Sequence, residues 1–544
     1  MTFDDCVYAC LLLLSLCFGP LMRQGKRSRS VLSPILGFSM AFAATGLTIW
    51  HSMVTVFGFV IFMAIFPPKF LHYIAVLWCF GYLGFFRTCH YFGFAPNPPV
   101  TNAVQLLITL RLIGVAFEIA DSSRIGHQLS GMNNMPNTAE RDRLKLIKEL
   151  KNVTVSPLNL VSYAYCYVGL FTGPYYKYRT FQDFVDWPSL APPIPTDQLL
   201  QQLQEAPFFG VSYLILSYFY TVDFVRTAEF YERPFRYRFF YMMIIFVVFR
   251  LRIYFAWKAA ECVCIAAGFG AYPRSSEPAS GEGPTNLVAL KSWMLKYKEP
   301  ERTVSESTSG QSAYAAVAQR DLIRPRRSST GPVADALSAS CSSPAVPLAV
   351  ESDTGYDFMT INNISVWGCE FAPTVREGMR SWNRSVQYWL ATNFNKRCPG
   401  GRLIRNAWTM LISAYWHGIH PGYYLSFLTV PLALLAESTL TQMMNTFGRN
   451  LPVGSLSLIS WLIKMRVFEY CAMGFLLLDA KATLTYWRSI GYCVHIFLVC
   501  LIVIGFFVNR FVPPPIYSAY RDILANQEQH RAEEAKALLR GNRL

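Results

Sequence analysis

Long apolar segments recur along this 544-residue chain, and they restrict its possible folds more than any other feature. A helix of about 20 apolar residues crosses a bilayer, and inside lipid only helices and closed barrels satisfy their own backbone hydrogen bonds. The segments lie at 5–22, 31–66, 71–94, 101–120, 207–224, 237–271, 421–437, 456–478 and 487–512. The segment 31–66 is long enough for two spans. The sequence therefore predicts an all-α fold, a polytopic transmembrane helical bundle with about eleven spans.

The composition agrees with a membrane protein and argues against a soluble enzyme with one anchor. Hydrophobic residues make up 53% of the chain and charged residues only 15%, against about 25% charged residues in soluble domains. The net charge of +15 indicates cytosolic loops that face anionic lipid. We expect no nucleic-acid partner, because no basic helix or aromatic-studded sheet is visible. The 14 cysteines show no disulfide or zinc spacing, so neither a metal nor a cofactor is expected.

Clusters of basic residues predict the orientation of the chain in the membrane. Arg23, Lys26, Arg27 and Arg29 directly follow the first apolar segment. Because cytosolic loops carry an excess of Lys and Arg, this loop is predicted to be cytosolic and the N-terminus luminal. The loop after the fifth predicted span is also basic, from Arg141 to Lys151, which agrees with the alternation. An odd number of crossings then places the C-terminus in the cytosol.

Changes in composition divide the chain into four parts. Residues 1–271 and 351–512 are predicted to form the N-terminal and C-terminal groups of transmembrane helices, the second of which carries the catalytic core. Between them, residues 272–350 are rich in Ser, Pro, Ala and charge, which predicts a disordered loop. Residues 513–544 are predicted to form a charged cytosolic tail. Within the first part, the aromatic, glycine-broken segment 157–180 is typical of a re-entrant or interfacial element.

The apolar segment 237–271 carries charges that cannot face lipid. Arg250, Arg252, Lys258 and Glu261 interrupt it. Charged side chains at membrane depth usually face a bundle interior or a polar cavity, and they often mark substrate pathways. We therefore expect this segment to tilt or to line a cavity, and we predict that Arg250 and Arg252 bind substrate.

The stretch 379–424 holds the strongest candidate for a catalytic base. His417 follows Trp416, and its imidazole, with an unperturbed pKa of about 6.5, could take a proton from a hydroxyl group. The alternative is a core histidine bonded to a backbone carbonyl. The break at Pro421-Gly422 favours the catalytic interpretation, since unwound backbone at membrane depth lines cavities. His420 could be the base instead, but the proline that follows it is expected to bend the backbone.

Asn383, which follows Trp382, is the second candidate for chemistry. Its amide could orient His417 or donate a hydrogen bond to a developing oxyanion. The alternative is a hydrogen bond between helices. The chain has no Gly-x-Ser-x-Gly elbow and no His with an Asp five residues later, and no signal selects a nucleophilic cysteine. A His–Asn pair without a nucleophile indicates direct transfer, in which a deprotonated hydroxyl attacks an acyl thioester and the thiolate leaves.

Several motifs together resemble one known family. They are Thr101–Leu107, Tyr165–Gly169, Thr172–Pro174, Ala260–Pro273, Met379–Asn383 and Ser413–Pro431. With an Asn in one segment and a His in a Trp-His-Gly-x-x-Pro-Gly-Tyr run, they are similar to the membrane-bound O-acyltransferase family, and within it to the branch that acylates lysophosphatidylinositol. The resemblance covers most of the chain outside 273–350, a segment longer than the family pattern.

The resemblance implies an enzyme of the endoplasmic reticulum membrane. It would transfer a polyunsaturated, arachidonoyl-type acyl chain from acyl-CoA, a substrate and not a cofactor, to the sn-2 hydroxyl of lysophosphatidylinositol. It also implies an internal tunnel that acyl-CoA enters from the cytosolic side. The catalytic His and Asn of the family fall on His417 and Asn383. The neighbouring residues expected to contact substrate are Trp382, Trp416, His420 and Tyr423.

Without the resemblance, the residues leave other functions open. One is a family member that acylates another lysophospholipid headgroup or a secreted peptide. Another is a proton-coupled transporter that uses His417 as a relay. A transporter should show paired repeats with matched broken helices, and none is visible. The sequence does not indicate an oligomeric state.

Overall fold

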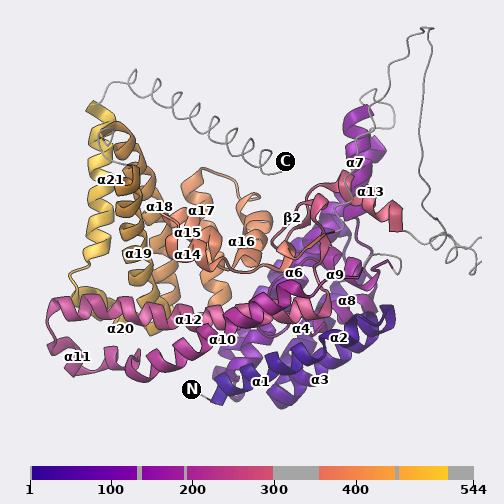
Figure 1. The fold of residues 1–544 in the computed structure, drawn as a ribbon, viewed down its shortest axis with the longest axis horizontal. Helices are drawn as coiled ribbons and strands as arrows, with labels where there is room; N and C mark the ends of the chain where they lie inside the picture. The colour runs from indigo at the N-terminus through magenta and orange to yellow at the C-terminus, as the bar shows by residue number, and fades with distance from the viewer. Residues whose placement is uncertain (1–2, 132–137, 189–192, 298–354, 448–452, 512–544) are drawn as a thin grey trace, which may run out of the picture.

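The computed structural model describes residues 3–131, 138–188, 193–297, 355–447 and 453–511, which are mostly helical (Figure 1). The predicted tail 513–544 lies outside the described residues. The N-terminal helices are α1 (Phe3–Cys17), α2 (Gly19–Met22), α3 (Ser33–Thr45), α4 (Trp50–Ile65), α5 (Pro68–Thr88), α6 (Pro99–Gly131), α7 (Thr138–Lys151), α8 (Pro157–Tyr165) and α9 (Tyr178–Val185). Proline opens several of them, because its fixed φ suits the first helical turn and its missing N–H is not needed there.

Two long helices connect the N-terminal and C-terminal groups. The elements of this middle region are α10 (Asp197–Phe219), α11 (Ala228–Glu232), α12 (Phe235–Ala267), β1 (Tyr272–Pro273), β2 (Pro278–Ala279), β3 (Gly283–Pro284), α13 (Leu287–Tyr297) and β4 (Tyr356–Asp357). Helices α10 and α12 pack along each other (Figure 1). Helix α12 ends at Gly268, whose left-handed φ of 72° stops the helix without the steric cost that a side chain would bring.

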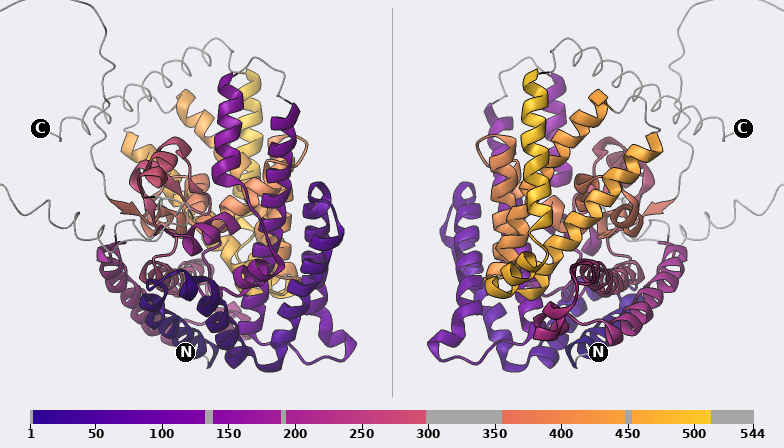
Figure 2. Two further views of the ribbon diagram at one scale, coloured as in Figure 1. Left: turned by 90° about the vertical axis from the view of Figure 1, so that its right-hand side faces the viewer. Right: turned by 90° about the vertical axis from the view of Figure 1, so that its left-hand side faces the viewer.

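The C-terminal group is a bundle with shorter helices on one side. Its elements are α14 (Val366–Phe371), α15 (Val375–Ser381), α16 (Arg384–Leu390), α17 (Arg402–His417), α18 (Pro421–Phe447), α19 (Val453–Leu477), α20 (Ala480–Ser489) and α21 (Cys493–Phe511). Helices α18, α19 and α21 pack side by side (Figure 2). The short α20 lies across their ends and is capped by the Asp479 carboxylate, which accepts a hydrogen bond from the Ala482 N–H.

The described residues confirm a helical membrane protein but not the predicted number of spans. Six helical segments are long and apolar enough to cross a bilayer, and the bent pair α20–α21 would make a seventh. Two differences lower the count below the predicted eleven. Segment 31–66 forms α3 and α4, of 13 and 16 residues, each shorter than a full span. Helix α19 carries Lys464, Arg466 and Glu469, which make it too polar to pass as an apolar span.

Two large apolar clusters form the cores of the molecule. The first joins α1 to α6, α8 and α9 with the end of α12, with α16 and with Trp416 of α17, and it includes Val386 and Leu390. The second joins the start of α12 with α18 to α21, and it includes Val467 and Cys471. Residues of both clusters line one internal cavity. The site described below therefore lies where the two cores meet.

The segment that follows α12 is more ordered than the sequence predicted. A disordered loop was expected from residue 272, whereas β1, β2, β3 and α13 occupy most of the stretch up to Tyr297. Strand β1 pairs with β4, from beyond the loop, and β2 pairs with β3. Tyr272 is buried, and its hydroxyl donates a hydrogen bond to the Asp183 carboxylate. The Pro, Gly and Ser content here builds tight turns, while residues 298–354 lie outside the described residues.

The aromatic segment 157–180 does not cross the membrane as one helix, in line with the predicted re-entrant element. Helix α8 ends at Tyr165, and the buried chain that follows is not helical until α9 begins at Tyr178. Two charged residues of α6 hold this unwound chain. The Arg111 guanidinium donates hydrogen bonds to two carbonyls in the last turn of α8 and to those of Cys166 and Val168 beyond it. The Glu118 carboxylate accepts from the first two N–H groups of α9, where the unwound chain ends.

Candidate active site

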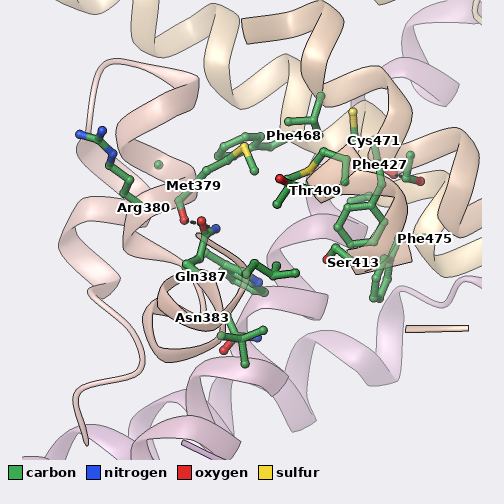
Figure 3. Close-up of a pocket in the computed structure, with 18 of the residues that line it drawn as sticks. Met379, Arg380, Asn383, Gln387, Thr409, Ser413, Phe427, Phe468, Cys471 and Phe475 are labelled. Carbon is green, nitrogen blue, oxygen red and sulfur yellow. Dashed lines mark hydrogen bonds between the residues drawn. The ribbon is translucent and has the colours of Figure 1, made fainter. Parts of the chain in front are cut away.

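A cavity of about 370 Å³ lies between α12, α15, α16, α17, α18 and α19. Figure 3 shows Asn383 and Gln387 on one side of it and Phe427, Phe475 and Ser413 on the other. Both predicted catalytic residues, Asn383 and His417, line this cavity. Residues far apart in the sequence thus line one cavity.

His417 is the last residue of α17, and the backbone after it is not helical. Gly418 is fully extended, with φ 174° and ψ 174°, and α18 starts at Pro421. The His417 ring stacks on Phe427 with ring centroids 5.2 Å apart and meets the edge of Phe475 at 5.1 Å. Among the described residues, no side chain or backbone group hydrogen-bonds to either ring nitrogen. The alternative of a core histidine tied to a backbone carbonyl therefore finds no support.

Arg87 holds the end of α17 from a neighbouring helix. This residue lies in the last turn of α5, and its guanidinium donates hydrogen bonds to the carbonyls of Tyr415, at 2.5 Å, and Trp416. The last carbonyls of a helix have no partner within the helix, so a buried end needs donors from elsewhere. Arg87 supplies them directly beside His417. Sequence reasoning missed this residue, because nothing in its local pattern shows which carbonyls it reaches.

Asn383 stands at the start of α16 in an unusual backbone conformation. Its φ of 46° and ψ of 51° are left-handed, a region that Asn tolerates better than most residues. Its carbonyl accepts a hydrogen bond from the Gln387 N–H at 2.9 Å. In the part of the chain that the structure describes, its side-chain amide has no hydrogen-bond partner. The amide is therefore available to a group inside the cavity.

A buried hydrogen-bond network supports the turn at Asn383 from behind. The Glu261 carboxylate on α12 is fully buried and accepts hydrogen bonds from the N–H groups of Asn363, at 2.6 Å, and Ile364. The Asn363 side-chain oxygen accepts from the Ser385 hydroxyl at 2.5 Å, and its carbonyl accepts from the Arg384 N–H at 2.8 Å. Glu261 was expected only to avoid lipid, and the role of Asn363 was missed, because both depend on contacts distant in sequence.

The other predicted substrate-binding residues divide into two groups. Trp382 and Arg250 line the cavity. Trp416, His420, Tyr423 and Arg252 are not among the described residues that line it. The Trp416 indole N–H donates to the Leu106 carbonyl at 3.3 Å, and the Arg252 guanidinium binds the Asp5 carboxylate at 2.6 Å. The structure thus places these four residues beside the site, and their contact with substrate stays a prediction.

Comparisons with known proteins identify the family of this chain. The family model described as MBOAT, membrane-bound O-acyltransferase family, matches residues 98–468. A Xenopus laevis protein named membrane-bound acylglycerophosphatidylinositol O-acyltransferase is 35% identical over 507 residues, which cover 93% of this chain and 94% of that protein. Its human namesake is 36% identical over 512 residues, 93% of this chain and 94% of that protein. A Drosophila melanogaster protein with the same descriptive name is 28% identical over 517 residues, 94% of this chain and 93% of that protein.

Proposed function

Because this chain belongs to the membrane-bound O-acyltransferase family, we propose that it transfers an acyl chain from acyl-CoA to the sn-2 hydroxyl of lysophosphatidylinositol. One observation carries the chemical part of the proposal. His417 and Asn383 line the same cavity, and neither the imidazole nor the amide has a hydrogen-bond partner among the described residues. The names of the relatives support the choice of acceptor.

The reaction needs a base, and His417 has the position for one. Its neutral imidazole accepts the proton of the acceptor hydroxyl as the hydroxyl oxygen attacks the thioester carbonyl. The tetrahedral intermediate then expels the CoA thiolate, which receives the proton from the imidazolium. No covalent enzyme intermediate forms, and the histidine returns to its neutral form.

Asn383 has the donor that the intermediate requires. Its amide N–H₂ hydrogen-bonds to the negative oxygen that develops on the thioester carbonyl carbon, or it orients the His417 ring. The left-handed turn and the Glu261–Asn363 network hold this residue rigidly, so little reorganisation is needed during the reaction. Arg87 fixes the opposite wall by holding the end of α17.

The apolar wall of the cavity suits a long acyl chain. Its aromatic members are Phe246, Phe249, Trp382, Phe427, Phe468 and Phe475. We propose a polyunsaturated, arachidonoyl-type donor because the family resemblance implies it. We place the enzyme in the endoplasmic reticulum membrane, with its N-terminus luminal and its C-terminus cytosolic, because the basic loops favour that orientation.

A microsomal assay tests the proposal. Labelled arachidonoyl-CoA is offered with lysophosphatidylinositol, lysophosphatidylcholine, lysophosphatidylethanolamine or lysophosphatidylserine, and product is measured in membranes with and without the protein. We expect the largest gain in product with lysophosphatidylinositol. The His417→Ala variant, at matched expression, controls for acyltransferases of the host. A larger gain with another headgroup would replace the acceptor, and no gain with any of them would contradict the proposed activity.

A further inference from the structure

Arg250 is a buried cation whose hydrogen-bonding capacity the protein does not use up. The residue lies midway along α12, only 7% exposed, and it lines the cavity. Its Nε lies 2.9 Å from the Glu370 carboxylate, and its guanidinium stacks over the Phe246 ring at 4.2 Å. Its Nη1 has no hydrogen-bond partner among the described residues. A buried donor without a partner costs free energy, and because Arg250 lines the cavity, a ligand bound there could supply the partner.

Glu370 holds the guanidinium in place from the side away from the cavity. Its carboxylate also accepts a hydrogen bond from the Tyr254 hydroxyl at 2.6 Å. Its backbone carbonyl accepts from the Trp461 indole and from the Lys464 ammonium. Glu370 itself does not line the cavity, whereas Arg250 does. The ion pair therefore orients the arginine, and the remaining edge of its guanidinium is left for another anion.

The cavity has a positive charge balance. Arg376 and Arg380 of α15 also line it, and they lie one helical turn apart, on the same face. Neither side chain forms an ion pair within the described residues. No Asp or Glu is among the described residues that line the cavity. A space with three arginines and no carboxylate favours an anionic ligand, and arginine is the residue best shaped for phosphate.

Arg250 lines the same cavity as the two candidate catalytic residues, Asn383 and His417, and the residue before it, Phe249, packs near both of them. The ring of its neighbour Phe249 packs between those of Trp382, at 6.1 Å, and Phe475, at 5.7 Å. Trp382 precedes Asn383, and Phe475 packs against His417 at 5.1 Å. In a lysophospholipid, the phosphate sits on the glycerol carbon next to the one that bears the sn-2 hydroxyl. In acyl-CoA, the whole pantetheine arm separates the phosphates from the thioester. A cation that lines the same cavity as the candidate catalytic residues therefore fits the acceptor phosphate better than the phosphates of CoA.

We infer that Arg250 binds the phosphodiester of the lysophospholipid acceptor and so fixes the sn-2 hydroxyl within reach of His417. The site recognises the phosphate that all lysophospholipids share, and Arg376 and Arg380 add positive charge to the same cavity. The inference rests on the proposed function only in taking a lysophospholipid as the acceptor. It holds for any headgroup, so an error in the choice of inositol would leave it unchanged.

Kinetics of charge-altering variants test this inference. Arg250→Lys keeps the positive charge but loses the planar guanidinium, which can form bidentate hydrogen bonds with a phosphate. Because Arg250→Gln alone would leave the Glu370 charge buried without its partner, it is combined with Glu370→Gln. For both variants we expect the KM for the lysophospholipid to rise, by about tenfold or more in the double variant, as for the loss of a hydrogen bond to a charged group. The KM for acyl-CoA should stay within about twofold, a change too small for a lost ionic contact.

The matched control is Arg397→Gln. Like Arg250, Arg397 pairs with a carboxylate, that of Asp121, and lies over a phenylalanine ring, that of Phe117, but it does not line the cavity. Its substitution should leave both KM values unchanged.

A comparison of two acyl donors shows whether Arg250 binds the phosphate of the lysophospholipid or the phosphates of CoA. Arachidonoyl-CoA is compared with arachidonoyl-pantetheine, which has no phosphate. A KM rise for the CoA donor but not for the pantetheine donor, with the acceptor KM unchanged, would assign Arg250 to acyl-CoA and overturn the inference. Unchanged KM values for all substrates would overturn it as well. The activity of the wild-type enzyme with each headgroup is measured in the same experiment, so a failure of the proposed function is recognised separately.

Discussion

Two regions of this protein place polar groups in aromatic, unwound surroundings, and they use them in opposite ways. In the first, between α8 and α9, the fully buried Arg111 donates hydrogen bonds to four backbone carbonyls and stacks over the Tyr176 ring at 4.7 Å. In the second, around the cavity, the side chains of Asn383 and His417 have no hydrogen-bond partner among the described residues. In the first region the polar side chain is hydrogen-bonded to the backbone, and in the second the polar side chains remain available to a ligand.

The histidines show the same contrast. His51 Nδ1 lies 3.0 Å from the Tyr82 hydroxyl. His495 has partners on both ring nitrogens, the Tyr470 hydroxyl at 2.7 Å and the Thr429 hydroxyl at 3.2 Å. His417 differs from both because its ring contacts are aromatic only. A polar side chain at membrane depth is therefore better judged by whether its hydrogen bonds are already made than by its presence alone.

If this contrast between the two regions is correct, substitution of His417 should lower the acyl-transfer rate more than any other change. His417→Ala should lower the acyl-transfer rate by about 10²–10⁴-fold or more, the range for loss of a general base, while expression and membrane insertion persist. The matched control is His495→Ala, which removes a histidine with two hydrogen-bond partners and should lower thermal stability more than turnover. If the His417→Ala variant keeps more than about a tenth of the wild-type rate, the loss is too small for a general base, and His417 is not the base.

Asn383 should act together with His417. Asn383→Ala is expected to lower the rate strongly without preventing folding, and the double variant should be no slower than His417→Ala alone, because residues that act as one unit are not additive. A double-mutant cycle on the transfer rate, with acyl-CoA binding measured separately, gives the coupling. Additive losses would mean that the two residues serve different steps, and Asn383 would then be a packing or substrate-binding residue.

In the first region, a substitution should affect stability and not chemistry. Arg111→Met removes the donor shared by four carbonyls, of which those of Tyr163 and Val168 keep the Cys166 N–H and the Tyr176 hydroxyl as donors. Each of the other two carbonyls is left without a partner, at a cost of about 1–3 kcal/mol. We expect a destabilisation of about 3 kcal/mol or more, seen as a lower melting temperature of the detergent-solubilised protein. The rate per folded molecule should stay near that of the wild type. An unchanged melting temperature together with a slow enzyme would reverse the distinction between the two regions.

Arg87 should affect both stability and catalysis. Like Arg111, it hydrogen-bonds to backbone carbonyls, but these carbonyls lie next to the predicted base. Arg87→Met should lower kcat by about tenfold, as for the loss of a charge-assisted hydrogen bond, with little change in either KM. The matched control is Arg238→Met, because Arg238 also donates to carbonyls near helix ends, those of Tyr231 and Ser489. Neither arginine lines the cavity, but the helix that Arg87 holds ends at His417, which does. Equal losses of kcat in both variants would reduce Arg87 to a general stabilising contact.

The smallest effect is expected from the long segment between α13 and β4. The Trp293 and Tyr356 rings on its two sides lie 6.2 Å apart, so a short linker can replace residues 300–350. This deletion should leave the rate within about twofold at matched protein level, because a Ser/Pro-rich stretch adds little to a packed core. A deletion that begins at residue 280 should abolish activity, since Gly281 N–H and Ser280 hydroxyl bind the carbonyls of Thr360 and Asn362, next to the support of Asn383. Loss of activity with the shorter deletion would show that the segment takes part in the reaction.

The sequence could indicate the class of protein and the two strongest catalytic candidates, because both depend on local properties. Runs of apolar residues predict membrane helices whatever their neighbours are. A single His or Asn within such a run is energetically unfavourable and therefore indicates a function. It could not give the number of spans. A run such as 31–66 can form two full helices or two shorter ones, and the packing partners decide between them.

By itself, the sequence determined that this chain is a helical membrane protein and that His417 and Asn383 are worth testing. Only the tertiary structure decided that these two residues line one cavity with Arg250, that Arg87 holds the end of α17, and that Arg111 is occupied by carbonyls. The physical reason is that a hydrogen bond is short and directional. Whether a polar group is satisfied or open depends on atoms that can lie hundreds of residues away, and no local pattern contains that information.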